Sequence, residues 1–350
     1  MPRIIFDVVC KKEDYFWALL MPIRNKNIKI LLNYGLGPVL FIWLSYSIYH
    51  QVSRQPHLDT AWRQIRQSFT GSGRWKLWLV LLLMPVNWGL EARKWQVLLQ
   101  PLERLSFFTS FKAILSGVAF SINTPNRIGE YGGRIVYVQE GHRWKAVALT
   151  ILGSMSQLMV TLLFGLGGLL FLLGNPVTGA ATAAYAVWIK ALFYGSLAVT
   201  ACLSLLYFRL GWLLQWLERI PKTGRFMRYL AVIENLPVRF LLRVVVLSGV
   251  RYIVFVIQYI LLLQLFNVEI GAWQAFWLIS VLYVVLAVTP TITLAELGIR
   301  GKVSLVLFNM VSANSLGIEW VAMSVWFINL VLPALAGSLL LLGIKIFSDK

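Results

Sequence analysis

The sequence predicts an all-α polytopic membrane protein. Hydrophobic residues make up 59% of the chain and charged residues only 13%, whereas a soluble domain is about 45–50% apolar and about 25% charged. Several apolar runs exceed the roughly 20 residues that a spanning helix needs. The runs are unbroken, so they lack the alternation over about 10 residues that marks the strands of a membrane barrel. The 15 Trp and 13 Tyr residues suit the aromatic belts at the two membrane interfaces.

Eight segments are long and apolar enough to be predicted as spanning helices. Pro85 lies in the middle of the second segment, and the fourth contains small residues that allow helices to approach closely. Those small residues are Gly153, Ser154, Gly165, Gly167 and Gly168. Between the first two segments, the polar stretch 51–74 has apolar residues at helical spacing, which is typical of a helix in the interface plane. The eight predicted spans are 28–50, 75–99, 106–123, 146–173, 182–208, 244–266, 271–289 and 318–344.

Basic residues set the predicted orientation, because cytoplasmic loops carry an excess of Lys and Arg. Residues 1–27 are expected to be a basic cytoplasmic tail, and their mixed charges do not match a cleavable signal peptide. The linker 209–243 carries seven basic residues against two acidic ones and is also predicted to be cytoplasmic. Lys345 and Lys350 place the C-terminus on the same side. We therefore expect a multi-pass protein of a bacterial-type inner membrane, with a membrane domain over 28–345.

The net charge of +18 is explained by these clusters beside apolar segments, where they attract anionic lipid. The sequence has no RNA-binding motif or zinc spacing, so nucleic acid is not an expected partner. Cys10 and Cys202 give no disulfide framework and no CxxC motif. His142 stands alone, so no metal site is expected. We find no P-loop, nucleotide fingerprint or Ser/His/Asp set, and we expect no cofactor.

The number of spans indicates two halves, each with an interrupted helix. Five spans precede the linker and three follow it, and both counts are odd. If both termini and the linker are cytoplasmic, each half needs one further or broken crossing. The unassigned segments are 124–145 and 290–315. Irregular backbone at membrane depth is tolerated only where protein or water covers it, so we expect two interrupted or re-entrant loops.

A weak internal repeat supports this division. Residues 86–100 align with 250–264 at a constant offset, and the two loops then align at nearly the same offset. We therefore predict pseudo-symmetric, inverted repeats at about 75–208 and 244–345. Paired interrupted segments in corresponding positions indicate a transporter site at the interface between the repeats.

The two loops share a motif that begins with Thr-Pro and ends with an acid and an arginine four residues apart. The acid/arginine pairs are Glu130 with Arg134 and Glu296 with Arg300, and each pair shares a helix face. A proline suits the start of a helix, whose free N–H groups attract an anion. We interpret Arg127, Arg134 and Arg300 as ligands of a lipid phosphate, with the acids pairing with them or with a headgroup amine. The alternative is ordinary cytoplasmic turns whose arginines reach headgroups.

A third polar cluster lies inside the second predicted span. It contains Asn87, Glu91, Arg93 and Lys94. Asn87, Glu91 and Lys94 fall on one helix face and could line the same substrate cavity. The alternative is that the cluster marks the end of the helix, with Arg93 and Lys94 reaching headgroups.

These motifs resemble the lysylphosphatidylglycerol synthase transmembrane region, also called the flippase-like domain family. The resemblance covers about residues 30–345 and depends on three features. They are the second span with its internal acid and basic pair, the motif Thr-Pro-x-Arg-x-Gly-Glu-x-x-x-Arg at 124–134, and a degenerate second copy of this motif.

In multidomain family members a separate cytosolic domain makes the aminoacylated lipid, and none is visible here. The resemblance therefore implies a stand-alone translocator of a phospholipid or a lipid-linked sugar. One alternative is a membrane enzyme that transfers a sugar or acyl group on a lipid carrier, with Glu91 or Glu130 as base. Another is a non-catalytic membrane partner that recruits a lipid-modifying enzyme through the linker.

Overall fold

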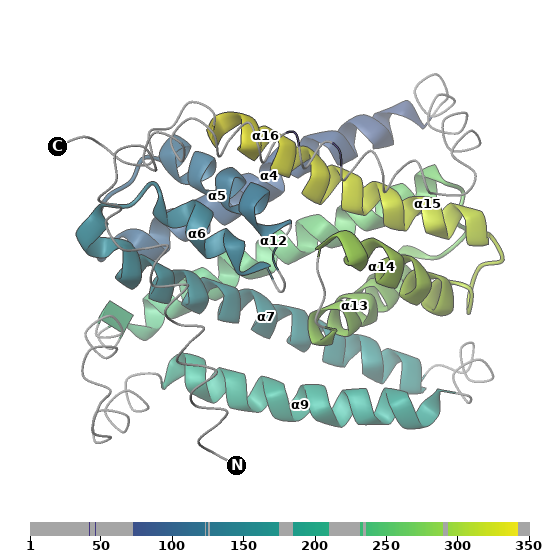
Figure 1. The fold of residues 1–350 in the computed structure, drawn as a ribbon. Coiled ribbons are helices and arrows are strands. Elements are labelled where there is room, and N and C mark those ends of the chain that lie inside the picture. The colour runs from purple at the N-terminus through teal and green to yellow at the C-terminus, as the bar shows by residue number, and fades with distance from the viewer. Residues whose placement is uncertain are drawn as a thin grey trace, which may run out of the picture.

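The computed structural model is helical throughout the part of the chain that it describes (Figure 1), as the sequence predicts. The described residues are 42, 46, 73–122, 124, 127–174, 185–209, 232–233, 236–289 and 293–341. The predicted tail, the first span apart from two residues, the interfacial helix and most of the linker lie outside these ranges. The described helices are α4 (Arg74–Leu99), α5 (Phe107–Ser121), α6 (Gly129–Ile135), η2 (Glu140–His142), α7 (Arg143–Gly174), α9 (Ala186–Phe208), α12 (Val238–Leu265), α13 (Ala272–Val288), α14 (Thr293–Phe308), α15 (Ser315–Trp326), η3 (Phe327–Val331) and α16 (Leu332–Leu341).

Four helical stretches in the described ranges are long and apolar enough to cross a membrane, and two apolar helices are shorter. The long stretches are Glu140–Gly174, Ala186–Phe208, Val238–Leu265 and Ser315–Leu341, and the shorter helices are Phe107–Ser121 and Ala272–Val288. Helix α4 is also 26 residues long, but it carries the polar cluster of the second predicted span. The number of eight spans stays a prediction.

A helix ends at each of the two predicted loops, and a new helix begins after it. Helix α5 ends at Ser121, and the short helix α6 folds back along it as a helical hairpin (Figure 1). The hairpin is tight because two glycines meet. A Cβ atom built on Gly133 would lie 2.6 Å from Cα of Gly117. In the second half, α13 ends at Val288 and α14 begins at Thr293.

Helices that precede the linker 209–243 pack against helices that follow it. Helix α4 lies against α12, α5 packs on α16, and α13 packs on α7. Gly168 of α7 permits the last contact, because a Cβ there would lie 2.6 Å from the carbonyl oxygen of Trp277 in α13. Likewise, a Cβ on Gly153 would lie 2.6 Å from a methyl group of Leu98 in α4. Close packing at these two glycines is therefore confirmed, while the inverted repeat stays a prediction.

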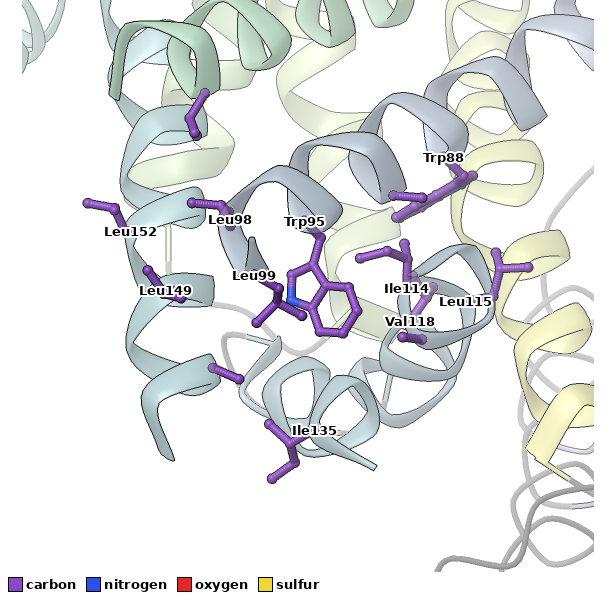
Figure 2. Packing of buried hydrophobic residues seen from close by; sticks show 14 of the residues in the cluster. Trp88, Trp95, Leu98, Leu99, Ile114, Leu115, Val118, Ile135, Leu149 and Leu152 are labelled. Atoms are coloured by element: carbon purple, nitrogen blue, oxygen red, sulfur yellow. The ribbon is translucent and has the colours of Figure 1, made fainter. Parts of the chain in front are cut away.

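The hydrophobic core next to the predicted site joins α4, α5 and α7. Figure 2 shows Trp95 of α4 directed toward Ile114 and Val118 of α5, while Leu98 is directed toward Leu149 of α7. All five side chains are buried. This packing fixes the rotation of α4, and the rotation turns the polar face of α4 toward α6 and α12.

Candidate functional site

Glu91 is the centre of a buried charge cluster. It lies in α4, and only 6% of its side chain is exposed. Its Oε1 is 3.1 Å from Nη2 of Arg134 in α6. Its Oε2 is 2.7 Å from Nζ of Lys94 and 2.9 Å from Nη1 of Arg251 in α12. A carboxylate at this depth needs compensating cations, and here side chains from three helices supply them.

Arg134 and Lys94 each have a further partner close to the cluster. Arg134 also contacts Glu130, one helical turn earlier in α6, so the acid and arginine of the first motif do share a helix face. Nζ of Lys94 is 3.4 Å from the carbonyl oxygen of Gly153 in α7, to which it donates. The side chain of Lys94 is only 2% exposed, so it does not reach toward headgroups as the alternative interpretation of this cluster required.

Arg251 connects the buried cluster to a cavity. Its Nε donates to Oδ1 of Asn87 at 2.9 Å, and its Nη1 donates to Oε1 of Gln157 at 3.4 Å. The guanidinium carbon also lies 5.0 Å from the ring centroid of Trp88 and 5.2 Å from that of Phe255, within the range of cation–π attraction. The side chain is therefore held on several sides, and it faces the cavity between the halves.

The two loop motifs meet at Glu296. Its Oε2 is 3.1 Å from Nη2 of Arg127 in the first loop, and its Oε1 contacts Arg300 one turn further along α14. Arg127 has a φ angle of 57°, in the left-handed region, which costs a non-glycine residue roughly 1–2 kcal/mol. Such strain persists at functional sites where neighbouring contacts hold it. Pro125 and Pro290 lie outside the described residues, so the helix-start hypothesis stays a prediction.

A cavity of about 600 Å³ separates the two halves at this point. Charged and polar side chains line it together with aromatic and aliphatic ones. Its lining comprises Trp88, Arg127, Gln157, Thr161, Arg251, Tyr252, Phe255, Tyr283, Leu286, Ala287, Val288, Thr289, Glu296, Arg300, Val325, Trp326, Asn329 and Leu330. Within the described ranges, no group of three or more His, Cys, Asp or Glu side chains is placed to hold a metal ion.

Eight of the nine predicted site residues belong to this connected arrangement, in two layers. Those that line the cavity are Arg127, Glu296 and Arg300. Those that form the layer behind it are Asn87, Glu91, Lys94, Glu130 and Arg134. Arg93 is separate, because it lies on the exposed face of α4 and contacts Gln96. Arg134 does not line the cavity, although the sequence analysis grouped it with the two arginines that do.

Three further polar residues line the cavity without belonging to the predicted site, namely Arg251, Gln157 and Asn329. A usable signal existed in each case, because each is a polar residue inside a long apolar segment. Arg251 and Asn329 lie outside the motif that the two loops share, so the comparison of the loops does not indicate them.

Comparison with known proteins agrees with the resemblance seen in the sequence. The family model described as Lysylphosphatidylglycerol synthase TM region matches residues 30–337, which is most of the chain. No curated protein and no solved structure matches the chain.

Proposed function

Because this chain belongs to the Lysylphosphatidylglycerol synthase TM region family, we propose that it moves a phospholipid or a lipid-linked sugar between leaflets. The family and the apolar helices together identify an integral membrane protein related to lipid modification or transport. The observation that supports translocation is the cavity between the halves, whose lining combines three arginines with aromatic and aliphatic residues.

A translocator must lower the cost of moving a charged headgroup through hydrocarbon. An ion loses its hydration there, and this loss is expensive unless polar partners replace the water. Arg127, Arg251 and Arg300 all line the cavity, and guanidinium groups bind phosphate oxygens well because of their planar donor geometry. In this proposal the phosphate passes along these arginines while the acyl or prenyl chains stay in the lipid.

The contact between the two loops suits a gate. Arg127 and Glu296 form an ion pair at 3.1 Å, and 42% of the Arg127 side chain is exposed. Glu296 is only 11% exposed, but it keeps Arg300 as a second partner, so its contact with Arg127 can open without leaving the carboxylate uncompensated. A phosphate entering the cavity would compete with Glu296 for Arg127 and Arg300, and would thereby separate the two loops.

The geometry favours translocation over the enzyme alternative. That alternative requires Glu91 or Glu130 to act as a base on a bound substrate. Glu91 is nearly inaccessible and contacts three cations, and Glu130 contacts Arg134. Neither residue lines the cavity, whereas a general base must come within hydrogen-bond distance of the proton that it removes.

The test is lipid scrambling in liposomes that contain the purified full-length chain. A phospholipid with a fluorescent label on one acyl chain is bleached from outside, and the protected fraction falls as lipid crosses. We expect Arg300→Gln to slow the wild-type rate roughly tenfold to hundredfold, because one charge-assisted hydrogen bond contributes about 1.5–3 kcal/mol. Arg93→Gln is the matched control, since it removes an arginine that lies outside the cavity. Equal rates for wild type and Arg300→Gln would exclude this site.

A further inference from the structure

Asn329 has a buried side chain whose hydrogen bonds are unmade. It lies in η3, a π-helical turn between α15 and α16, and is 6% exposed. Neither Oδ1 nor Nδ2 has a hydrogen-bond partner among the described residues, and the residue lines the cavity. A buried polar group without a partner destabilises the fold, and π-helical turns occur frequently at functional sites. A ligand in the cavity would supply both missing partners.

Arg300 offers further donors to the same cavity. One of its terminal nitrogens contacts Glu296. Its Nε and its other terminal nitrogen make no hydrogen bond to a residue in the described part of the chain. The residue is 7% exposed, and its guanidinium carbon is 5.9 Å from the ring centroid of Tyr283. Arg300 and Asn329 thus bring unused donors to the cavity from the second motif and from the last long helical stretch.

The charges at the cavity are unbalanced. The layer behind it is neutral, since Lys94 and Arg134 face two carboxylates. The described lining has an excess of two positive charges, because it contains one carboxylate, Glu296, and three arginines, of which Arg251 also contacts Glu91. A dianionic ligand would balance this excess.

A positively charged headgroup finds no free carboxylate in the described lining. Glu296 is the only acid there, and Arg127 and Arg300 already share it. An ammonium group would therefore stand close to three guanidinium groups without compensation. This arrangement disfavours an aminoacylated, cationic lipid.

We propose that the cavity selects lipids whose headgroup is a dianionic phosphoryl group, a phosphomonoester or a diphosphate, and that Arg300 and Asn329 contact it directly. The inference depends on the proposed function, because it names the substrate class of the same cavity. It concerns binding, however, and can be measured in detergent without any transport.

The experiment compares the binding of four probes to the purified full-length chain by native mass spectrometry and thermal shift. The probes are dioctanoyl phosphatidic acid, dioctanoyl phosphatidylglycerol, dioctanoyl lysyl-phosphatidylglycerol and inorganic phosphate. We expect phosphatidic acid to bind at least about tenfold more tightly than phosphatidylglycerol, which is the equivalent of one charged hydrogen bond, and the lysyl lipid to bind weakest. Equal affinity for phosphatidic acid and the lysyl lipid would overturn the proposal. Competition by inorganic phosphate at the same concentration as phosphatidic acid would overturn its assignment to a lipid.

Asn329→Leu tests the direct contact, because leucine has the same branched arrangement of heavy atoms and lacks both polar atoms. We expect phosphatidic acid to bind about tenfold more weakly and the melting temperature of the empty protein to stay the same or rise. Gln258→Leu is the matched control. Gln258 is also a buried amide in an apolar helix, but it lies outside the cavity and donates to the carbonyl oxygen of Val80 at 2.9 Å. If Asn329→Leu lowers the melting temperature as the control does and leaves lipid affinity unchanged, Asn329 has only a structural role. Scrambling plays no part in this result, so a failure of transport is distinguishable from a failure of the site.

Discussion

Replacing Glu91 by glutamine should destabilise the protein more than removing one of the cations around it. The cluster of Glu91, Glu130, Lys94, Arg134 and Arg251 contains three cations and two carboxylates. Glu91→Gln leaves one carboxylate for the three cations, whereas Lys94→Met leaves two carboxylates for two cations. Glutamine keeps the size of the side chain, so the comparison isolates charge.

The expected magnitude follows from the distances. The central carboxylate is 2.7 to 3.1 Å from its three cations. With an effective dielectric constant of about 20, a pair at this distance has a gross attraction of about 5–6 kcal/mol, and desolvation offsets much of it. Removing one partner leaves buried charge uncompensated and typically costs about 3–5 kcal/mol. We expect a loss of this size for Glu91→Gln and a smaller one for Lys94→Met.

The assay is thermal unfolding in detergent, followed by scanning fluorimetry and by size-exclusion chromatography of heated samples. Wild type, Glu91→Gln and Lys94→Met are compared at one pH and salt concentration, with Arg93→Gln as an exposed control in the same helix. We expect the order wild type, then Lys94→Met, then Glu91→Gln, with the control equal to wild type. If the melting temperature of Glu91→Gln equals that of wild type, or exceeds that of Lys94→Met, the charge around Glu91 does not control stability as argued.

Two further predictions concern the loops. The effects of Arg127→Gln and Glu296→Gln on the melting temperature should not add in the double variant, because these two side chains contact each other at 3.1 Å; scanning fluorimetry of the wild type, the two single variants and the double variant checks this, and additive effects would refute the contact between the loops. Gly133→Leu should push α6 away from α5, because even a Cβ there would lie 2.6 Å from the α5 backbone. We expect the free energy of unfolding to fall by about 1–3 kcal/mol or more, as in overpacked cores, and less folded monomer to be recovered. Gly132→Leu should be tolerated, because a Cβ there meets nothing within 4 Å.

The sequence was informative about the site because charge is rare in these helices. The shared Thr-Pro and acid/arginine motif drew attention to Arg127, Glu296 and Arg300, and the structure brings these three into contact. The polar face of α4 was visible for the same reason, since a carboxylate and a lysine in an apolar helix need partners. Helical periodicity placed Glu91 and Lys94 on one face, which the structure confirms.

The partners across the interface could not be read from periodicity. Arg251 meets Glu91 only because α12 packs on α4, and such pairings between distant segments depend on tertiary packing. Arg93 illustrates the converse. It is adjacent in sequence to Lys94 and equally basic, but the helical rotation of about 100° per residue carries it to the exposed face of α4. Composition marks a polar segment, whereas packing decides which of its side chains turn inward.

The two layers of charge indicate that stability and ligand binding depend on different residues. The layer behind the cavity is neutral, and its ion pairs stabilise the junction of α4 and α6. The lining carries the positive excess and the unused donors. Arg134→Gln, which removes the partner of Glu130 and one of the three partners of Glu91, should therefore lower the melting temperature. Arg300→Gln, which removes part of the excess, should lower affinity for dianionic lipid with a smaller effect on melting. The opposite pattern would mean that the arginines of the lining hold the fold and that the cavity is not organised around a ligand.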